Sequence, residues 1–555
     1  MLTFDEDKQD KKIDELHKKE EEELAMVLSG KYDLEYLDLS RISIESDALR
    51  LIPEDVARRA HLAVFDATGR KLRIALLSPE NEEAKSVLED LERRNYNITP
   101  YMVSKASLER AWGRYKEISF ASETKAGVLD ISSEEIEGFV SKVRELSDVQ
   151  KLIEDMLAEK KAYRISRILE IVLAGALSMG ASDIHVEPED EYVRLRYRLD
   201  GVLTEIINFD RPTFQLLLSR IKLLSRLKLN VKSEAQDGRF SIKIADSEIE
   251  VRTSLLPGAY SESIVLRILN PKSISVPMEE LGIPPNLFKI LEREIKKPNG
   301  MLLNTGPTGS GKTTTLYAFL RRVHRPEIKI ITIEDPIEYH LPGIVQTQVD
   351  HKEYNFSNGL RSALRQDPDV IMVGEIRDSE TAEIAINAGL TGHLVLSTLH
   401  TNNAAGAFPR LIDLGINPKV ISSSVNVVLA QRLIRKLCPS CRVEEVVTPE
   451  VKKLIETELS TLKDPTSPRT IEKIFKAVGC PKCNGLGYKG RLGIYEAILM
   501  DEAVNKVINE NPGEADIVRA AENQGIPSLK QDGFLKIVAG ITTLEELSRV
   551  IDVGI

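Results

Sequence analysis

Aromatic residues are scarce in this 555-residue sequence, and basic residues are outnumbered by acidic ones. Aromatic side chains make up 5% of the chain, whereas proteins that bind single-stranded nucleic acids stack the bases on aromatic platforms. The 86 Asp and Glu residues outnumber the 75 Lys and Arg residues, which gives a net charge of -11. An acidic balance argues against a partner that is held on a basic surface. We therefore expect no nucleic-acid partner.

Long apolar runs are absent as well. The most apolar stretch, from Ile168 to Ala181, is interrupted by Glu170 and is too short to cross a bilayer. The first residues contain Asp5, Glu6 and Asp7 and lack the apolar core of a secretory signal. We therefore expect a cytoplasmic protein that is peripheral to the membrane at most.

Cysteine is rare but regularly arranged. All four cysteines lie in two C-x-x-C motifs, Cys438 with Cys441 and Cys480 with Cys483. Each tight turn can direct two thiolates at one ion, so the pattern predicts a structural Cys₄ zinc site. Disulfides are disfavoured in a reducing compartment, and the alternatives left open are a redox-active C-x-x-C pair or unrelated thiols.

The most specific motif is a glycine-rich loop between an apolar run, Met301 to Leu303, and a predicted helix that begins near Thr314. Its residues are Gly306, Pro307, Thr308, Gly309, Ser310, Gly311, Lys312 and Thr313. Glycines let backbone N–H groups surround a phosphate. Lys312 would supply charge to the β- and γ-phosphates, and Thr313 a hydroxyl ligand to Mg²⁺. The loop predicts binding of a nucleoside triphosphate.

Carboxylates and histidines follow the next predicted strands. Glu334 ends one β-branched run, and Glu375 follows a second, from Val370 to Gly374. The carboxyl ends of adjacent parallel strands share one edge of a sheet, so both are candidates to organise Mg²⁺ and the attacking water. His393 and His400 frame a third strand and are predicted to sense the γ-phosphate.

Arginines alternate with apolar residues in a separate part of the chain. Arg252 and Arg267 fall on the polar faces of two such strands, and periodicity alone favours a solvated sheet face for them. His185 and Glu187 have metal-ligand spacing, but without a third ligand a structural role is the expected one.

Together these segments resemble the ATPases of type II secretion and type IV pilus assembly, the GspE/PilB family. The resemblance lies in the Walker A motif, the aspartate box, the Walker B motif and the histidine box, which are residues 306–315, 331–338, 364–378 and 391–402. It extends to residues 181–188, 237–240, 431–433 and 487–491.

The resemblance implies a homo-hexamer that binds ATP between a PAS-like domain and a RecA-like domain. It implies that Arg252 and Arg267 are arginine fingers, that Glu375 organises Mg²⁺ and water, and that Glu334 is the general base. Asp335 and Glu338 would support Glu334. The implied partners are an inner-membrane platform protein and a membrane-anchored adaptor, which places the hexamer at the inner face of the plasma membrane.

The resulting domain organisation is an α/β fold in several parts. A charged segment (1–30) and a small α/β domain (31–115) precede a linker (116–160). The PAS-like domain (161–275) and the RecA-like core (276–435) follow, and then a Cys₄ zinc subdomain (436–495) and a helical region (496–555).

Some departures and alternatives stay open. The chain has Ser261 before Glu262 and Asn403 after the histidine box, where the family has glycine and an acidic residue. The amino-terminal region lacks the Arg-Leu-Gly start and Leu-rich repeat of relatives that bind cyclic di-GMP, which argues against regulation by that nucleotide. The alternative functions are a pilus-retraction or DNA-uptake motor, a nucleic-acid translocase, and a scaffold that binds ATP without turnover. The motifs do not distinguish a pilus, a secretion pseudopilus and a competence filament.

Overall fold

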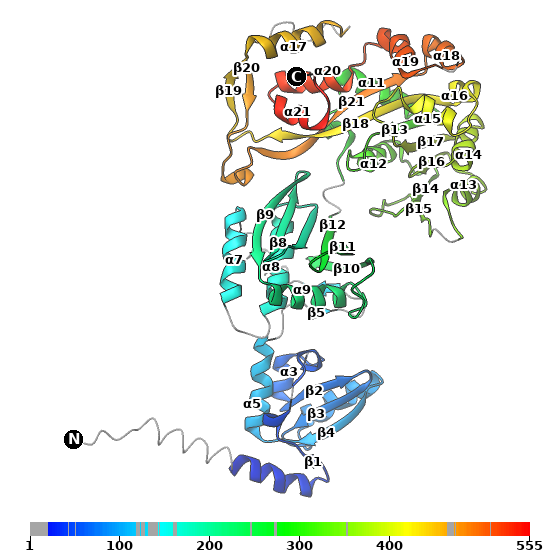
Figure 1. Ribbon diagram of the computed structural model, residues 1–555. Helices are drawn as coiled ribbons and strands as arrows, with labels where there is room; N and C mark the ends of the chain where they lie inside the picture. The colour runs from blue at the N-terminus through cyan, green and yellow to red at the C-terminus, as the bar shows by residue number, and fades with distance from the viewer. Residues whose placement is uncertain are drawn as a thin grey trace.

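The computed structural model arranges the chain as three bodies, one after another (Figure 1). The predicted charged segment up to residue 19 and most of the predicted linker lie outside the residues that the structure describes. Those described are 20–42, 44–49, 51–117, 122–123, 128–130, 143, 145–158, 164–244, 247–270, 275–350, 353–462, 471, 473–510 and 512–554.

The first body is a four-stranded sheet with helices. A helix at residues 20–31 precedes the elements β1 (Glu35–Tyr36), η1 (Leu39–Arg41), α2 (Ser46–Leu49), α3 (Glu54–Arg59), β2 (Leu62–Thr68), β3 (Lys71–Leu76), α4 (Glu82–Arg93), β4 (Asn97–Met102), α5 (Lys105–Gly113) and η2 (Arg114–Glu117). The strand order is β1-β4-β3-β2. Alternating apolar residues of β3 enter the core, where the indole N–H of Trp112 donates to the carbonyl oxygen of Leu62 over 3.0 Å.

The second body is an eight-stranded sheet in the order β5-β6-β10-β11-β12-β7-β8-β9. Its elements are β5 (Ser122–Glu123), β6 (Val128–Asp130), α7 (Leu146–Ala158), α8 (Arg164–Ser178), β7 (Asp183–Pro188), β8 (Val193–Leu199), β9 (Val202–Phe209), α9 (Arg211–Leu224), β10 (Gln236–Ile244), β11 (Ser247–Pro257) and β12 (Glu262–Leu269). Apolar residues of β8 are buried against the helices, and Tyr197 donates to the carbonyl oxygen of Val172. Strand alternation therefore sends the arginines of this sheet to its other face.

The third body contains a seven-stranded sheet in the order β15-β14-β16-β17-β13-β18-β21, parallel except for β21. Its elements are η3 (Met278–Glu280), α11 (Pro285–Glu294), β13 (Gly300–Thr305), α12 (Lys312–Val323), β14 (Ile330–Glu334), β15 (Val345–Gln348), α13 (Phe356–Leu364), β16 (Val370–Val373), α14 (Ser379–Leu390), β17 (Leu394–Leu399), α15 (Ala407–Asp413), α16 (Pro418–Ser424), β18 (Val425–Leu437) and β21 (Tyr488–Leu499). The four central strands are almost wholly buried, as their continuous apolar runs predict. The expected mixed α/β fold with a mainly parallel sheet around the glycine-rich loop is confirmed.

Between β18 and β21 the chain forms an insertion. It consists of β19 (Val443–Val446), α17 (Pro449–Ser460), β20 (Lys473–Lys476) and η4 (Pro481–Cys483). After β21 come α18 (Glu502–Ile508), α19 (Glu514–Ala521), η5 (Glu522–Gln524), α20 (Leu529–Val538) and α21 (Leu544–Val550). Helix α21 is tied to β18 because the buried Glu546 accepts hydrogen bonds from Arg435.

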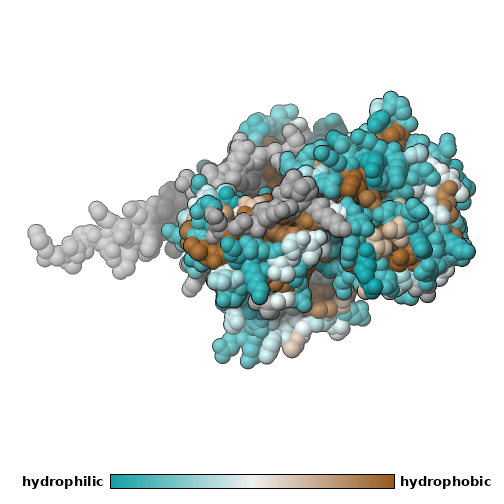
Figure 2. Space-filling model, turned by 90° about the horizontal axis from the view of Figure 1, so that it is seen from above, coloured by the Kyte–Doolittle hydropathy of each residue, from teal (hydrophilic) through white to brown (hydrophobic). Residues whose placement is uncertain are grey.

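The surface is consistent with the composition. Figure 2 shows hydrophobic residues in separate patches on a largely hydrophilic face. Among the described residues, no helix combines the length and the apolar character that crossing a membrane requires.

Candidate functional site

The glycine-rich loop connects β13 to α12 at the carboxyl edge of the third body's sheet. Gly306, Gly309 and Gly311 have φ angles of 149°, 78° and 90°, in the range that favours glycine. A side chain at Gly306 would also lie 2.6 Å from the carbonyl oxygen of Gln431. Helix α12 begins at Lys312 directly after Gly311, which has no side chain to cap it. Its first N–H groups are therefore placed to bind an anion.

Lys312 lies inside the curve of this loop. Its Nζ donates to the carbonyl oxygens of Gly306 and Pro307, at 2.7 and 3.1 Å. Burial lowers the pKa of Lys312 to about 8, although the nearby carboxylate of Glu375 opposes that shift. Phosphate oxygens bound there would favour the charged ammonium, as the motif predicts.

Residues of β18 pack against the glycine-rich loop and hold it in place. Gln431, which is buried, donates to the carbonyl oxygen of Ser310 over 2.6 Å and accepts from Asn304 over 2.8 Å. Its neighbour Arg432 donates to the backbone carbonyl of Asn402, the last residue of the histidine box. Gln431 and Arg432 had only their family resemblance as a signal in the sequence, because β18 is more than a hundred residues from the loop.

Glu375 lies at the same edge and is largely buried. It forms an ion pair with Arg377 over 2.7 Å and lies within hydrogen-bond distance of the His400 imidazole, at 3.2 Å. The structure therefore brings together three predicted site residues, Lys312, Glu375 and His400.

His393 lies elsewhere. It precedes β17, and its backbone carbonyl accepts from the N–H of Gly300 at the start of β13. The glycine-rich loop follows the other end of β13, and six residues of parallel strand span roughly 20 Å. Within one chain, the expectation that both histidines face the same nucleotide fails, because the two flank opposite ends of one strand.

Glu334 is buried behind the edge and is surrounded by hydrogen-bond donors. Its carboxylate accepts from the hydroxyls of Tyr317 and Thr332 and from the amide of Gln346. Burial raises the pKa of Glu334, although these donors oppose that shift. Four residues later, Glu338 is part of an open loop and is within 3.3 Å of Arg252. Glu334 as general base stays a prediction, and Glu338 is the aspartate-box carboxylate that lies between the bodies.

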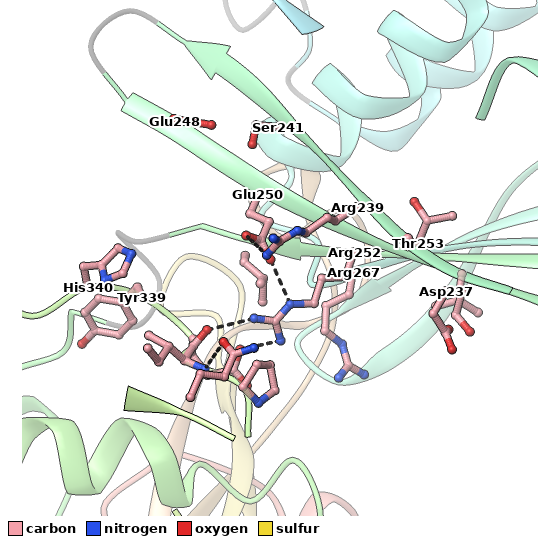
Figure 3. Close-up of a pocket in the computed structure, with 18 residues that line it drawn as sticks. Asp237, Arg239, Ser241, Glu248, Glu250, Arg252, Thr253, Arg267, Tyr339 and His340 are labelled. Carbon is pink, nitrogen blue, oxygen red and sulfur yellow. Dashed lines mark hydrogen bonds and ion pairs between the residues drawn. The ribbon is translucent and has the colours of Figure 1, made fainter. Parts of the chain in front are cut away.

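A cavity of about 1060 Å³ separates the sheet of the second body from the aspartate-box loop of the third. Arg252 and Arg267 line it from β11 and β12, and residues 336–340 line it from the other side. Figure 3 shows the two arginine side chains close together, with dashed lines joining Arg252 to the opposite loop. The solvated face that periodicity suggested is therefore one wall of an interdomain cleft.

The four cysteines converge. Their Sγ atoms all lie within 4.8 Å of one another, and three of the Sγ–Sγ separations are 3.7, 3.8 and 3.9 Å. A tetrahedron with Zn–S bonds of about 2.3 Å has edges of about 3.8 Å, so the thiolates fit Zn²⁺. All four cysteines are free thiols, which are available to bind a metal. The expected Cys₄ cluster is confirmed as a site that could hold zinc.

The cluster also adjoins the second body. Leu486, three residues after Cys483, packs against the core of that body. The N–H of Gly490 donates to the carboxylate of Asp200, in the β8–β9 turn, over 2.8 Å. The second C-x-x-C motif thus lies beside a contact between two bodies, which nothing in the local sequence indicates.

We expect one zinc ion per chain, bound in a structural role. The Cys441→Ser variant should lose the metal and unfold more readily around the insertion, because structural zinc contributes on the order of 10 kcal/mol to local folding. Elemental analysis and thermal melting of reduced protein measure both effects. Ser440→Ala, within the same motif, is the matched control and should keep its zinc. Wild-type protein that is folded but free of zinc would contradict the assignment.

Comparisons with known proteins agree with the geometry. A family model described as "Type II/IV secretion system protein" matches residues 158–549, and one described as "MshEN domain" matches residues 32–121. The expectation about cyclic di-GMP stays a prediction.

Two relatives are similar over most of their length. The Vibrio cholerae protein named "Type II secretion system ATPase E" is 39% identical over 511 residues, 91% of this chain and 97% of that protein. The Pseudomonas aeruginosa "Type II secretion system protein E" is 46% identical over 407 residues, 73% of this chain and 79% of that protein.

One solved structure supports the fold alone. The X-ray structure of the Yersinia pseudotuberculosis ATPase DotB has a TM-score of 0.50 at 19% identity and covers 69% of this chain and 93% of that one. The family follows from the sequence comparisons. A family model matches more than half of the chain, and a 39% identical relative extends over 91% of it. The chain therefore belongs to the family of type II/IV secretion system proteins.

Proposed function

We propose that this protein is an ATPase motor, in which hydrolysis at the glycine-rich loop moves the second and third bodies relative to each other. The observation that carries the proposal is the cleft between them. Arginines of the second body face the aspartate-box loop of the third body. Lys312 lies in the glycine-rich loop of that third body, at the carboxyl edge of its sheet. A change at the phosphates would alter contacts across this cleft, so hydrolysis and domain movement would be coupled.

Each residue of the glycine-rich loop and its surroundings has a separate role in the proposed hydrolysis. Backbone N–H groups of the loop and Lys312 bind the β- and γ-phosphates, and Thr313 and Glu375 hold Mg²⁺, directly or through water. Bound Mg²⁺ would neutralise phosphate charge. His400, paired with Glu375, would respond to the γ-phosphate, and Arg267 would stabilise the charge that develops there.

Two carboxylates compete for the role of general base. Glu334 is enclosed by three donors, and a base must be free to accept a proton from water. Glu338 is partly exposed and lies in the cleft beside Arg252. We therefore propose that Glu338 contacts the attacking water and that Glu334 holds the aspartate-box strand in place.

At the level of the assembly, we propose a homo-hexamer that drives formation of a type II secretion pseudopilus. The names of the relatives support secretion over pilus assembly or retraction. The hexamer would act at the inner face of the plasma membrane on an inner-membrane platform protein, through a membrane-anchored adaptor. The Cys₄ insertion and the amino-terminal body favour this role over that of a retraction motor.

Phosphate release from ATP by the purified full chain tests the proposed function. We expect slow turnover that requires Mg²⁺, disappears in EDTA and is unchanged by single-stranded DNA. ATP binding without any Mg²⁺-dependent turnover would indicate a scaffold. Turnover that rises on DNA, together with salt-sensitive DNA binding, would indicate a nucleic-acid translocase.

The same assay separates the two carboxylates. Glu338→Gln should lower kcat by about a hundredfold with little change in ATP affinity, since removal of a general base costs roughly 10²–10⁴ in rate. Glu334→Gln should mainly lower the melting temperature, because it disturbs three buried hydrogen bonds. The reverse pattern, with kcat lost only in Glu334→Gln, would restore Glu334 as the base.

A further inference from the structure

A row of charged side chains crosses the sheet of the second body at right angles to its strands. The strand register places Arg252 of β11 opposite Arg267 of β12, Arg267 opposite Asp183 of β7, and Asp183 opposite Arg198 of β8. Residues that are directly opposite on antiparallel strands have Cβ atoms about 5 Å apart. Arg239 of β10 also lies opposite Arg252, so four guanidinium groups share this row of the sheet with a single carboxylate.

Asp183 is the anchor of this row. Its side chain is only 7% exposed, and it pairs with Nε of Arg267 through Oδ1 over 2.9 Å. Its Oδ2 lies 3.3 Å from Nε of Arg198 and accepts from the hydroxyl of Ser182 over 2.8 Å. Both carboxylate oxygens are thus engaged. A buried charge is screened little by salt, so these pairs restrict Asp183 more than a surface ion pair would.

Arg252 and Arg267, two of the arginines that line the cleft, are held differently. Arg252 uses its whole guanidinium, with Nε on Glu250, Nη1 on Glu338 and Nη2 on the carbonyl oxygen of Ile337. Arg267 is 61% exposed and is bound only through Nε. Among the residues that the structure describes, its two Nη atoms have no hydrogen-bond partner. Of the two arginines that the family resemblance implies as fingers, Arg267 is therefore the one whose outer donors are available to an anion in the cleft.

We propose that Asp183 is a positioning residue for Arg267 and that it turns the two Nη groups toward the γ-phosphate of ATP. A guanidinium has donors on both of its edges, and a carboxylate that binds Nε fixes the plane in which the other edge lies. Asp183 does not line the cleft and would not touch the nucleotide. The proposal rests on the proposed ATP hydrolysis, and it adds a residue to which neither the motifs nor the cleft assigns a role.

Asp183→Asn is the direct test, because it keeps the size of the side chain and removes its charge. We expect kcat for ATP to fall by about ten- to a hundredfold, as small misplacements of a catalytic group do. KM should change less than about threefold, since the glycine-rich loop binds the ground state. Glu187→Gln is the matched control. It lies on the same strand and face, pairs with Arg196 outside the row, and should keep kcat within about twofold of wild type.

A double mutant separates positioning from a general structural effect. In an Arg267→Ala background, Asp183→Asn should cause no further loss of kcat, because Asp183 acts through Arg267. Losses that multiply in the double mutant would overturn the proposal, as would wild-type kcat in Asp183→Asn. Wild-type kcat in Arg267→Ala alone would instead refute the finger role in the proposed function.

A second substitution keeps the test valid if Asp183→Asn does not fold. Asp183→Glu retains the charge of the row and moves the carboxylate by one methylene group. We expect reduced kcat with a melting temperature close to that of wild type. Wild-type kcat in this folded variant would contradict positioning by Asp183.

Discussion

The Lys312→Ala variant is expected to lose ATP turnover almost completely, by about a thousandfold or more, because it removes the cation that stabilises the charge on the transferred phosphoryl group. Nucleotide affinity should fall as well, since Lys312 lies inside the loop that would surround the phosphates. Phosphate release and binding of a fluorescent ATP analogue measure the two effects. Glu375→Gln should also abolish turnover, but it should retain more affinity because the loop is intact.

Lys506→Ala is the matched control for this experiment. Lys506 is an exposed lysine on α18 and should leave both turnover and affinity unchanged. Retained turnover in both Lys312→Ala and Glu375→Gln would mean that hydrolysis does not occur at the glycine-rich loop.

The geometric features that the sequence predicted are those in which neighbouring residues act together. Gly306 to Thr313 form one continuous loop, and each C-x-x-C motif presents its two thiols from a single turn. In such segments the local backbone fixes the geometry, so spacing in the sequence carries the spatial information. In the Cys₄ cluster, two motifs about forty residues apart must also come together. Because the chain has only four cysteines, just one combination of them could supply four thiolate ligands.

The parts that sequence reasoning missed depend on strand direction and register. His393 and His400 flank the same strand, yet only its carboxyl end lies beside the glycine-rich loop. The three donors around Glu334 come from α12, from β14 itself and from β15, and no local pattern connects Tyr317 or Gln346 to it. Burial of this carboxylate becomes visible only when the strands and the helix are packed.

The row of charged side chains on the second body's sheet likewise could not be predicted from local sequence patterns. Alternation correctly placed Arg252 and Arg267 on polar faces, and it suggested a solvated surface because most polar sheet faces are solvated. The pairing of Arg267 with Asp183 joins residues 84 positions apart through the register of β7 and β12. Whether a polar face meets water or another body depends on the interdomain cleft, which periodicity does not describe.

Replacing Arg267 with alanine is the second change with a large expected effect. An arginine finger contributes about a thousandfold or more to phosphoryl transfer, and its removal should lower kcat by that order. ATP affinity should stay within a modest factor, because Lys312 and the loop still bind the ground state. Arg239→Ala is the matched control, since Arg239 lines the same cleft but is 75% exposed and, within the part of the chain that the structure describes, has only a 3.8 Å ion pair with Glu250. Its kcat should change less than about threefold.

Arg252→Ala should behave differently from Arg267→Ala. Arg252 holds Glu338 and the backbone of Ile337, so its loss should loosen the aspartate-box loop and raise KM as well as lower kcat. Steady-state kinetics of both variants, with melting temperatures as a check on folding, would separate the two roles. Near-normal kcat in both would show that neither arginine takes part in hydrolysis.

Mixing two inactive variants tests whether Arg267 acts on its own chain or on a neighbour. Arg267→Ala chains keep a complete loop, and Lys312→Ala chains keep a complete finger. If the finger reaches across a subunit interface, hybrid oligomers contain some sites in which an intact loop meets an intact Arg267, and phosphate release should reappear on mixing. If the finger acts within one chain, every site lacks one of the two groups, and the mixture should stay as inactive as its parts. Recovery that follows the statistical fraction of hybrid interfaces would therefore show that Arg267 acts on the nucleotide of a neighbouring chain.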